Sequence, residues 1–223
     1  MKFGILGYLV LLLSSTYMKI KKIGWTTFLI STDGISLLTD PLQMKEEGLN
    51  IPKTEADICI FTNKPEGKYD DKIGPDKRAK IMEIFTPGEY EVGGLMIRRD
   101  FNEEFYIIDE KNLRVVYMGG VSKGFDPEKT KNLGDVDALI LPVGDGDSFM
   151  DYDTLEKVIS YIDPAILIPC AYKEEGKKST GIKTKEEFIK HFGYANATDE
   201  GFVNLARKRV EEEQKSVQVI FLK

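Results

Sequence analysis

The stretch Pro87-Gly88-Glu89-Tyr90-Glu91-Val92-Gly93-Gly94 opens the most regular part of the chain. Its two final glycines are typical of a tight turn, so residues 90–99 are expected to fold as a β-hairpin. A second hairpin is expected over residues 105–118, where Lys111-Asn112 supplies the turn. The middle of the chain is therefore predicted to be antiparallel sheet.

The N-terminal side of these hairpins is also predicted to form short strands. Residues 20–23, 26–30 and 35–39 are apolar and β-branched runs separated by turn residues. Residues 57–61 form a continuous apolar run, which is typical of a strand buried on both faces. Residues 77–84 are expected to form a short helix or an irregular connection.

The C-terminal half alternates between strand and helix patterns. The predicted strands are residues 138–143, 165–169 and 216–222. Residues 151–162 repeat apolar side chains at helical spacing, and Asp151 or Asp153 is expected to cap this helix. A second helix is expected over residues 185–192, opened by Thr184.

The length, composition, net charge and cysteine content restrict the class of protein. A chain of 223 residues, 42% hydrophobic and 30% charged, is long enough for one globular domain with a real core and is unlike a disordered chain. A net charge of −6 gives no basic footprint, so no nucleic-acid partner is expected. Cys59 and Cys170 follow no CxxC spacing and lie in apolar runs, which predicts reduced, buried thiols in a cytoplasmic protein.

The N-terminal residues 1–17 stand apart from the rest. A lysine followed by an apolar run is similar to the start of a signal peptide, but no small-x-small cleavage site follows it. The uncharged run is shorter than the roughly 20 residues that span a bilayer. Three interpretations stay open: an upstream extension from a mis-called start, an export signal, or a weak membrane anchor. Residues 18–223 are predicted to form a single domain.

Stretches spread over residues 18–173 resemble, in the right order, the motifs of the metallo-β-lactamase superfamily, in its compact prokaryotic zinc-dependent hydrolase-like branch. The matching segments are residues 24–30, 34–42, 56–70, 87–94, 134–144 and 164–173. The segment 87–94 is the most specific match, to a Pro-Gly-Glu-Tyr-Glu-Val stretch. The resemblance implies a mixed α/β (α+β) fold, the αββα sandwich of two mixed sheets with helices outside.

The resemblance also implies which positions would hold metal. In the family, a buried strand ends in Thr-His-x-His-x-Asp-His, and these His and Asp side chains bind zinc. In this chain the corresponding positions of that turn and of the other ligands carry Trp25, Asn63, Pro65, Gly67, Lys68, Tyr117, Gly120 and Ala171. A two-zinc hydrolase needs imidazole and carboxylate ligands that converge on both ions. The zinc of the family is therefore not predicted here, nor is another cofactor or a catalytic residue.

A residual site has a few candidates: Asp40, Asp145, Asp147 and Cys170. By the resemblance, Asp40 lies just outside the family's metal shell, and Cys170 lies close to the old metal cavity. Asp145 and Asp147 offer oxygen ligands for a hard cation, although a glycine-rich turn leading into a helix cap explains them as well. The single histidine, His191, is expected near a helix end, away from this site.

Three functions follow as hypotheses. The first is a catalytically silent protein of the metallo-β-lactamase fold, acting as a scaffold, partner subunit or binding module, in which Trp25 and Tyr117 fill the old cavity. The second is a hydrolase rebuilt around Asp40, Asp145 and Asp147. The third is a small-molecule sensor with an aromatic-lined pocket. A protein partner or a homo-oligomer fits the first, and a membrane partner is expected only if residues 1–17 are a real anchor.

Overall fold

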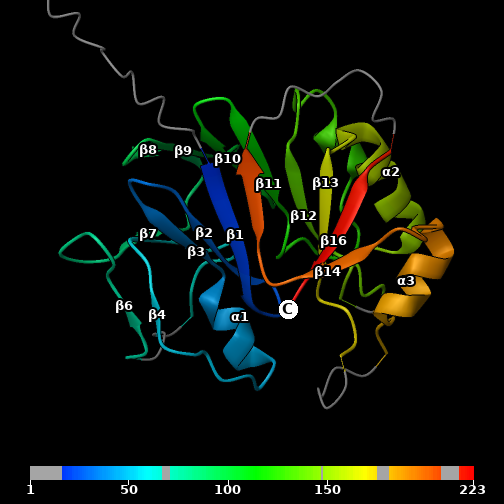
Figure 1. Ribbon diagram of the computed structural model, residues 1–223, viewed down its shortest axis with the longest axis horizontal. Coiled ribbons are helices and arrows are strands. Elements are labelled where there is room, and N and C mark those ends of the chain that lie inside the picture. Colours follow the sequence, from blue (N-terminus) through cyan, green and yellow to red (C-terminus); the bar gives the residue numbers. More distant parts are fainter. Residues whose placement is uncertain (1–16, 67–70, 147, 175–180, 207–215) are drawn as a thin grey trace, which may run out of the picture.

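The computed structural model describes residues 17–66, 71–146, 148–174, 181–206 and 216–223. Two β-sheets face each other, and α2 (Tyr152–Ile162) and α3 (Lys185–Phe192) lie outside the larger sheet (Figure 1). This is the sandwich that the sequence predicted. The prediction for residues 1–17 lies outside the described residues except at Tyr17, where the first strand begins.

The smaller sheet has six strands in the order β15-β1-β2-β3-β5-β7. Their bounds are β15 Val203–Ala206, β1 Tyr17–Gly24, β2 Thr27–Ser31, β3 Ser36–Thr39, β5 Ile58–Ile60 and β7 Met82–Ile84. β3, β5 and β7 run parallel, so the chain leaves β3 and β5 at the same end of the sandwich. A separate two-stranded sheet pairs β4 (Thr54–Glu55) with β6 (Ile73–Gly74).

The larger sheet has eight strands in the order β14-β16-β13-β12-β11-β10-β9-β8. Their bounds are β14 Thr198–Glu200, β16 Gln218–Leu222, β13 Ile166–Cys170, β12 Ala138–Pro142, β11 Leu113–Tyr117, β10 Tyr106–Glu110, β9 Leu95–Arg99 and β8 Gly88–Val92. The two predicted hairpins are confirmed as β8–β9 and β10–β11. β11, β12 and β13 then run parallel and also end at one edge.

The helices start at the residues that physical chemistry favours. Asp151 caps α2, where its carboxylate accepts the Thr154 N–H at 2.8 Å. Thr184 opens α3 with a full capping box. His191 lies exposed in the last turn of α3, with its ring 4.5 Å from that of Tyr152. These three positions agree with the sequence prediction.

Other elements differ from the prediction or were not predicted. Residues 77–84 hold no helix: the last three form β7, because their backbone pairs in parallel with β5. The short helix α1 (Pro41–Glu46), the 3-10 turn η1 (Pro127–Thr130), and β4, β6, β14 and β15 were not predicted. Each is six residues or shorter, which is too short for a hydrophobic period to show.

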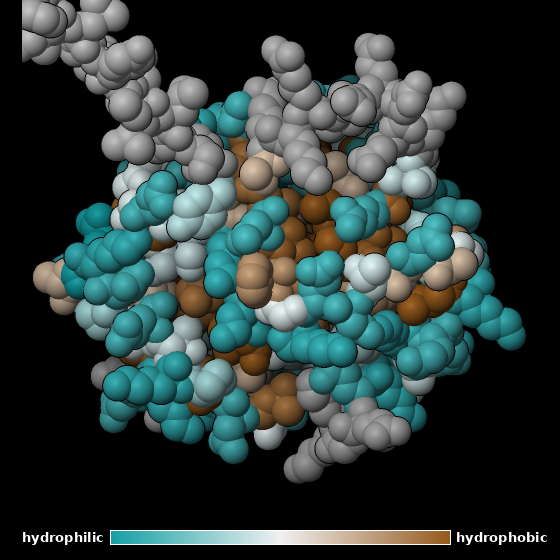
Figure 2. Space-filling model, in the orientation of Figure 1, coloured by the Kyte–Doolittle hydropathy of each residue, from teal (hydrophilic) through white to brown (hydrophobic). Residues whose placement is uncertain are grey.

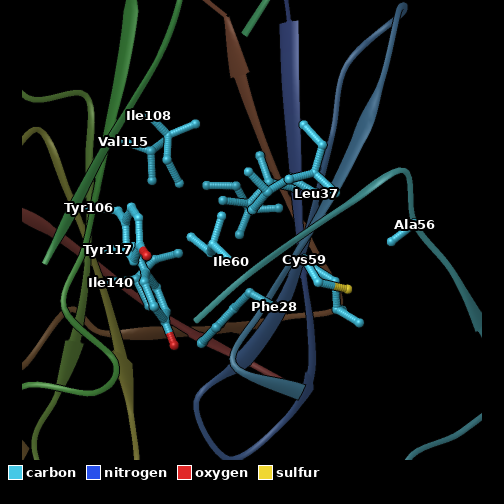
Figure 3. Packing of buried hydrophobic residues seen from close by; sticks show 14 of the residues in the cluster. Phe28, Leu37, Ala56, Cys59, Ile60, Tyr106, Ile108, Val115, Tyr117 and Ile140 are labelled. Atoms are coloured by element: carbon cyan, nitrogen blue, oxygen red, sulfur yellow. The ribbon is translucent and has the colours of Figure 1, made fainter. Parts of the chain in front are cut away.

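Apolar side chains form two cores, one on each side of the larger sheet. Between the sheets, Tyr117 and Ile140 face Ile60 and Phe28 (Figure 3). The second core lies between the larger sheet and its helices, for example around Leu155. Both cysteines are free and buried, as predicted. No helix of the described part is long and apolar enough to cross a membrane.

The outer surface is mixed in character. On the face shown in Figure 2, hydrophilic side chains cover most of the surface, and hydrophobic ones lie between them near the centre. The exposed large apolar residues of the described chain are few: Tyr17, Met96, Phe101 and Phe202.

Candidate functional site

The predicted site positions gather at the end of the sandwich where the parallel strands finish. Asp40 follows β3, Thr62 lies two residues beyond β5, and Tyr117 is the last residue of β11. Ala171 follows β13. The carboxyl ends of parallel strands commonly carry the functional site of a mixed α/β fold, so the topology alone marks this edge.

Tyr117 joins the two sheets through its hydroxyl group. Its ring is fully buried, and Oη lies 2.6 Å from Asp40 Oδ2 and 2.9 Å from the backbone oxygen of Thr26. The hydroxyl has one proton, so it donates to one of these two acceptors at a time. Because β11 belongs to one sheet, and Asp40 and Thr26 to the other, this side chain bridges the sandwich.

Thr62 holds the same carboxylate from a third direction. Its backbone N–H donates to Asp40 Oδ1 at 2.7 Å, and its hydroxyl donates to Oδ2 at 2.5 Å. Both oxygens of Asp40 are therefore engaged inside the protein. A buried carboxylate with three donors is a satisfied structural group.

Arg99 supports Thr62 from the larger sheet. Its Nη1 donates to the carbonyl oxygens of Thr62 at 2.7 Å and Phe61 at 3.2 Å. Tyr106 also donates to the Phe61 oxygen, at 2.8 Å. The turn that would carry zinc ligands in the family thus begins with a backbone that β9 and β10 fix in place.

Two glycines close over this network. A Cβ at Gly119 would overlap the Tyr117 hydroxyl, and a Cβ at Gly120 would overlap the side chain of Thr62. The space that a side chain at position 120 would need is therefore filled by Thr62. Only glycine fits at both positions without a shift of the buried hydroxyl groups.

Burial sets the protonation of the ionisable groups here. Burial raises the pKa of Asp40, and the hydrogen bonds from Thr62 and Tyr117 oppose it only in part. Burial and the nearby Asp40 raise the pKa of Tyr117 well above its ordinary value. Burial also raises the pKa of Cys170 to about 12, with a small opposing effect of Lys22. Cys170 is therefore a thiol at neutral pH, which does not suit a nucleophile.

The backbone of the same edge is strained. Trp25, Asp40, Asp145 and Ala171 have φ of 51°, 37°, 41° and 49°, in the left-handed region that favours glycine. Such residues cost about 1 to 3 kcal/mol each and concentrate at functional sites. The strained backbone therefore indicates that this edge is a candidate functional site, but it does not identify a reaction or a ligand.

Trp25 fills part of the cavity and lines what is left. It is 4% exposed, and its ring centroid lies 5.9 Å from that of Phe149. A cavity of about 140 Å³ remains beside Trp25, Gly119 and Gly120. A second cavity of about 200 Å³ is lined by residues that include Asp40, Asn63 and Pro65. Trp25 is therefore both a buried side chain of this edge and a lining residue of the remaining cavity.

The remaining predicted residues are partly placed. Gly67, Lys68 and Asp147 lie outside the described residues. Asp145 is half-buried, and no hydrogen bond among the described residues joins it to Asp40. Sequence reasoning did not connect Thr26, Gln43, Thr62 or Arg99 with this network. Thr62 adjoins the quoted turn, which is a signal, whereas nothing local marks Arg99 as its support.

Comparison with known proteins establishes the class. The model of the β-lactamase superfamily domain matches residues 19–171, and the chain belongs to this superfamily. It is 25% identical to a UPF0173 protein of Pyrococcus abyssi over 187 residues, which are 71% of this chain and 85% of the relative.

Solved structures show the same fold. A Thermotoga maritima protein named as a zinc-dependent hydrolase of the metallo-β-lactamase superfamily has a TM-score of 0.72 at 21% identity, covering 92% of this chain and 98% of its own. Igni18, a metallo hydrolase of Ignicoccus hospitalis, has a TM-score of 0.57 at 15% identity, covering 86% and 100%.

The residues present do not fit the zinc that this superfamily implies. Zinc sites use His, Cys, Asp and Glu side chains that converge on the ion. Among the described residues no group of three or more such side chains is placed to hold one. Asp40 is a single carboxylate already held by the protein: its Oδ1 accepts from the Thr62 N–H, and its Oδ2 lies within hydrogen-bond distance of the Thr62 and Tyr117 hydroxyls.

Proposed function

We propose that this chain is a catalytically silent protein of the metallo-β-lactamase fold, which works without zinc as a scaffold, partner subunit or binding module. The observation that carries the proposal is the Tyr117 hydroxyl, 2.6 Å from Asp40 Oδ2 at the position that the family resemblance gives to a metal-binding histidine. A phenol hydroxyl that hydrogen-bonds a buried carboxylate has a structural role. The raised pKa of Tyr117 keeps this hydroxyl protonated.

The hydrogen bonds around Asp40 join the two sheets at this edge, which is the structural effect that bound metal ions would have. Metal ions at this edge would tie the turns of the two sheets together by bonds to side chains from both. Here the Tyr117 hydroxyl joins β11 to Asp40 and Thr26, and Arg99 joins β9 to the turn at Thr62. These hydrogen bonds therefore explain how the two sheets stay together at this edge without metal ligands. The positions that the resemblance gives to such ligands include Trp25, Tyr117, Gly120 and Ala171.

A hydrolase rebuilt around Asp40, Asp145 and Asp147 is the less supported alternative. Its first carboxylate is within hydrogen-bond distance of three internal donors, and no hydrogen bond among the described residues links Asp145 to it. A hard cation needs several oxygens that point into a common space. A metal-dependent mechanism would have to break the Asp40 network first.

A small-molecule sensor is a second candidate, which one observation favours. The cavity beside Trp25 is bounded by an aromatic pair and by backbone and side-chain polar groups. Aromatic side chains combined with polar groups that can orient a ligand are features that binding pockets share. Sensing and scaffolding are compatible, because both use the site without chemistry.

We also propose the cytoplasm as the compartment, on the basis of the two free, buried thiols. Alkylation of the protein inside intact cells, followed by mass spectrometry after unfolding, tests this proposal. Both cysteines should be found as thiols. A disulfide or an exported, shortened chain would contradict it.

Metal content tests the main proposal. The untagged protein, purified without chelator and incubated with zinc, manganese and calcium, is measured by inductively coupled plasma mass spectrometry. We expect far less than one equivalent of each metal, and no change in thermal stability with added zinc. Near-stoichiometric metal would overturn the proposal. The Asp40→Asn variant would then show whether that metal uses this carboxylate.

A further inference from the structure

The cavity beside Trp25 is small and has a mixed lining. Trp25 and Phe149 line it, with ring planes tilted by 60°. The turn at Gly119-Gly120 also lines it, and Gln43 and Glu47 come from α1 and its end. The volume is about 140 Å³. An engineered apolar cavity of roughly 150 Å³ holds one benzene ring, so this space suits one six-membered ring.

Hydrogen-bond donors are available on the turn. The N–H of Val121 donates to the Met118 oxygen at 3.0 Å and closes a β-turn. The two central residues of such a turn keep their own N–H groups out of the closing bond. Those residues are Gly119 and Gly120, and no hydrogen bond among the described residues engages their N–H groups.

Gln43 adds a donor with a fixed orientation. Its Oε1 accepts the hydroxyl of the buried Thr26. The amide NH₂ is therefore the end of the side chain that is left for the cavity. Because Gln43 also lines the neighbouring cavity beside Asp40, this amide stands between the two spaces.

Acceptors lie on the same cavity. Glu47 contributes a carboxylate, and Ser148 contributes a hydroxyl. None of the described residues that line the cavity is lysine or arginine. A free carboxylate or phosphate would lack a counter-charge and would meet Glu47, so an anionic ligand is disfavoured. A neutral ring with both an acceptor and a donor fits the set.

We propose that this cavity binds a neutral, planar six-membered ring that carries a carbonyl beside an N–H group, such as a pyrimidine base or another single-ring lactam. The carbonyl accepts from the Gly119-Gly120 turn and from Gln43, the N–H donates to Glu47 or Ser148, and the ring packs on Trp25 and Phe149. The inference rests on the proposed function, since the cavity occupies the edge where a metal centre would otherwise lie.

The chain contains one tryptophan, so its fluorescence reports on this cavity alone. Uracil is the probe, and pyridine, a ring of the same size without the carbonyl and N–H pair, is the control. We expect uracil to change the Trp25 fluorescence saturably and pyridine to bind about tenfold more weakly, as for one lost hydrogen bond in a desolvated site. An equal response to both rings, or none to uracil, would overturn the proposal.

Variants make the test specific. Gln43→Glu keeps the acceptor for Thr26 and replaces the NH₂ donor by an oxygen, so uracil affinity should fall about tenfold. Gln218→Glu, an exposed position on β16, is the matched control and should bind as the parent does. An unchanged affinity in Gln43→Glu would overturn the assigned contact.

A parallel titration with zinc separates this inference from the proposed function. Failure of uracil to bind to a protein that also takes no zinc overturns the ring site and leaves the metal-free proposal standing. Stoichiometric zinc overturns the proposed function, and with it the basis of the ring site.

Discussion

Gly120 lies directly against Thr62, so that any side chain at position 120 would overlap the Thr62 methyl and hydroxyl groups. By the family resemblance, this is the position of a carboxylate that bridges two zinc ions. The close approach therefore excludes that carboxylate by shape as well as by residue type.

Gly120→Ala is expected to lower the free energy of unfolding by about 1 to 3 kcal/mol, because even one methyl group overfills the space beside Thr62. Urea denaturation measures the change. Gly201→Ala is the matched control, since nothing lies within 4 Å of a Cβ there; it should change stability by less than about 0.5 kcal/mol. Equal effects of the two changes would show that position 120 has room.

Tyr117→Phe removes only the hydroxyl that joins the sheets. The loss removes the one donor that Asp40 Oδ2 and the Thr26 oxygen share in a buried site, so we expect destabilisation by about 1 to 3 kcal/mol. Tyr161→Phe removes a hydroxyl that bonds Glu128 at the surface and should have little effect. A neutral Tyr117→Phe would contradict the structural role of the bridge.

Protonation of Asp57 makes the free energy of unfolding depend on pH in the acid range. Burial alone would raise its pKa, but hydrogen bonds from the backbone N–H groups of Lys77, Arg78 and Ser36 and from the Ser36 hydroxyl lower it below the ordinary 3.8. The unfolded state then binds the proton more tightly. The contribution of Asp57 is therefore present above its unfolded pKa and is lost as pH falls through the folded value.

We expect Asp57→Asn to be less stable than the parent at neutral pH, with a smaller loss of stability on acidification. Chemical denaturation at a series of pH values measures both. Asp153→Asn, an exposed position in the first turn of α2, controls for the change of net charge. A pH profile of Asp57→Asn parallel to that of the parent would show that Asp57 does not carry this linkage.

Ala171→Gly should leave the stability nearly unchanged, although it removes a buried methyl group. Ala171 has φ of 49°, where an L-residue is strained by about 1 to 2 kcal/mol and glycine is not. Glycine loses about 0.5 to 1 kcal/mol of that gain through the freedom of the unfolded chain, and the lost methyl group costs about 0.8 kcal/mol more. Ala138→Gly, a buried position outside the left-handed region, lacks the gain and should destabilise. Thermal melting compares the two variants, and an equal loss of stability at both positions would contradict the strain.

Much of the secondary structure was predictable because its signals are local, whereas the αββα sandwich was predicted only through the family resemblance. The hairpins β8–β9 and β10–β11 follow from turn residues between β-branched runs, and α2 follows from its period and its Asp151 cap. β7 was wrongly read as helix or irregular chain because three residues carry no period. It becomes a strand by pairing with β5, which is a non-local effect.

The candidate site was predictable only in part. Asp40 and Tyr117 were singled out by resemblance, but they are 77 residues apart and nothing local indicates that their side chains bond. Arg99 and Thr62, which bond through the Thr62 carbonyl, are 37 residues apart. In the sequence alone, Arg99 is indistinguishable from a charged residue exposed to solvent at a strand end. Such links depend on sheet packing, which sequence patterns do not encode directly.

The close packing of Tyr117 against Gly119, and of Thr62 against Gly120, has a consequence for protein engineering. A carboxylate introduced at position 120 would overlap Thr62, and a histidine at position 117 would lose the two hydrogen-bond partners of the tyrosine hydroxyl. Each of these changes made alone therefore costs stability. A metal centre designed at this edge would require Thr62, Tyr117 and Gly120 to be replaced together.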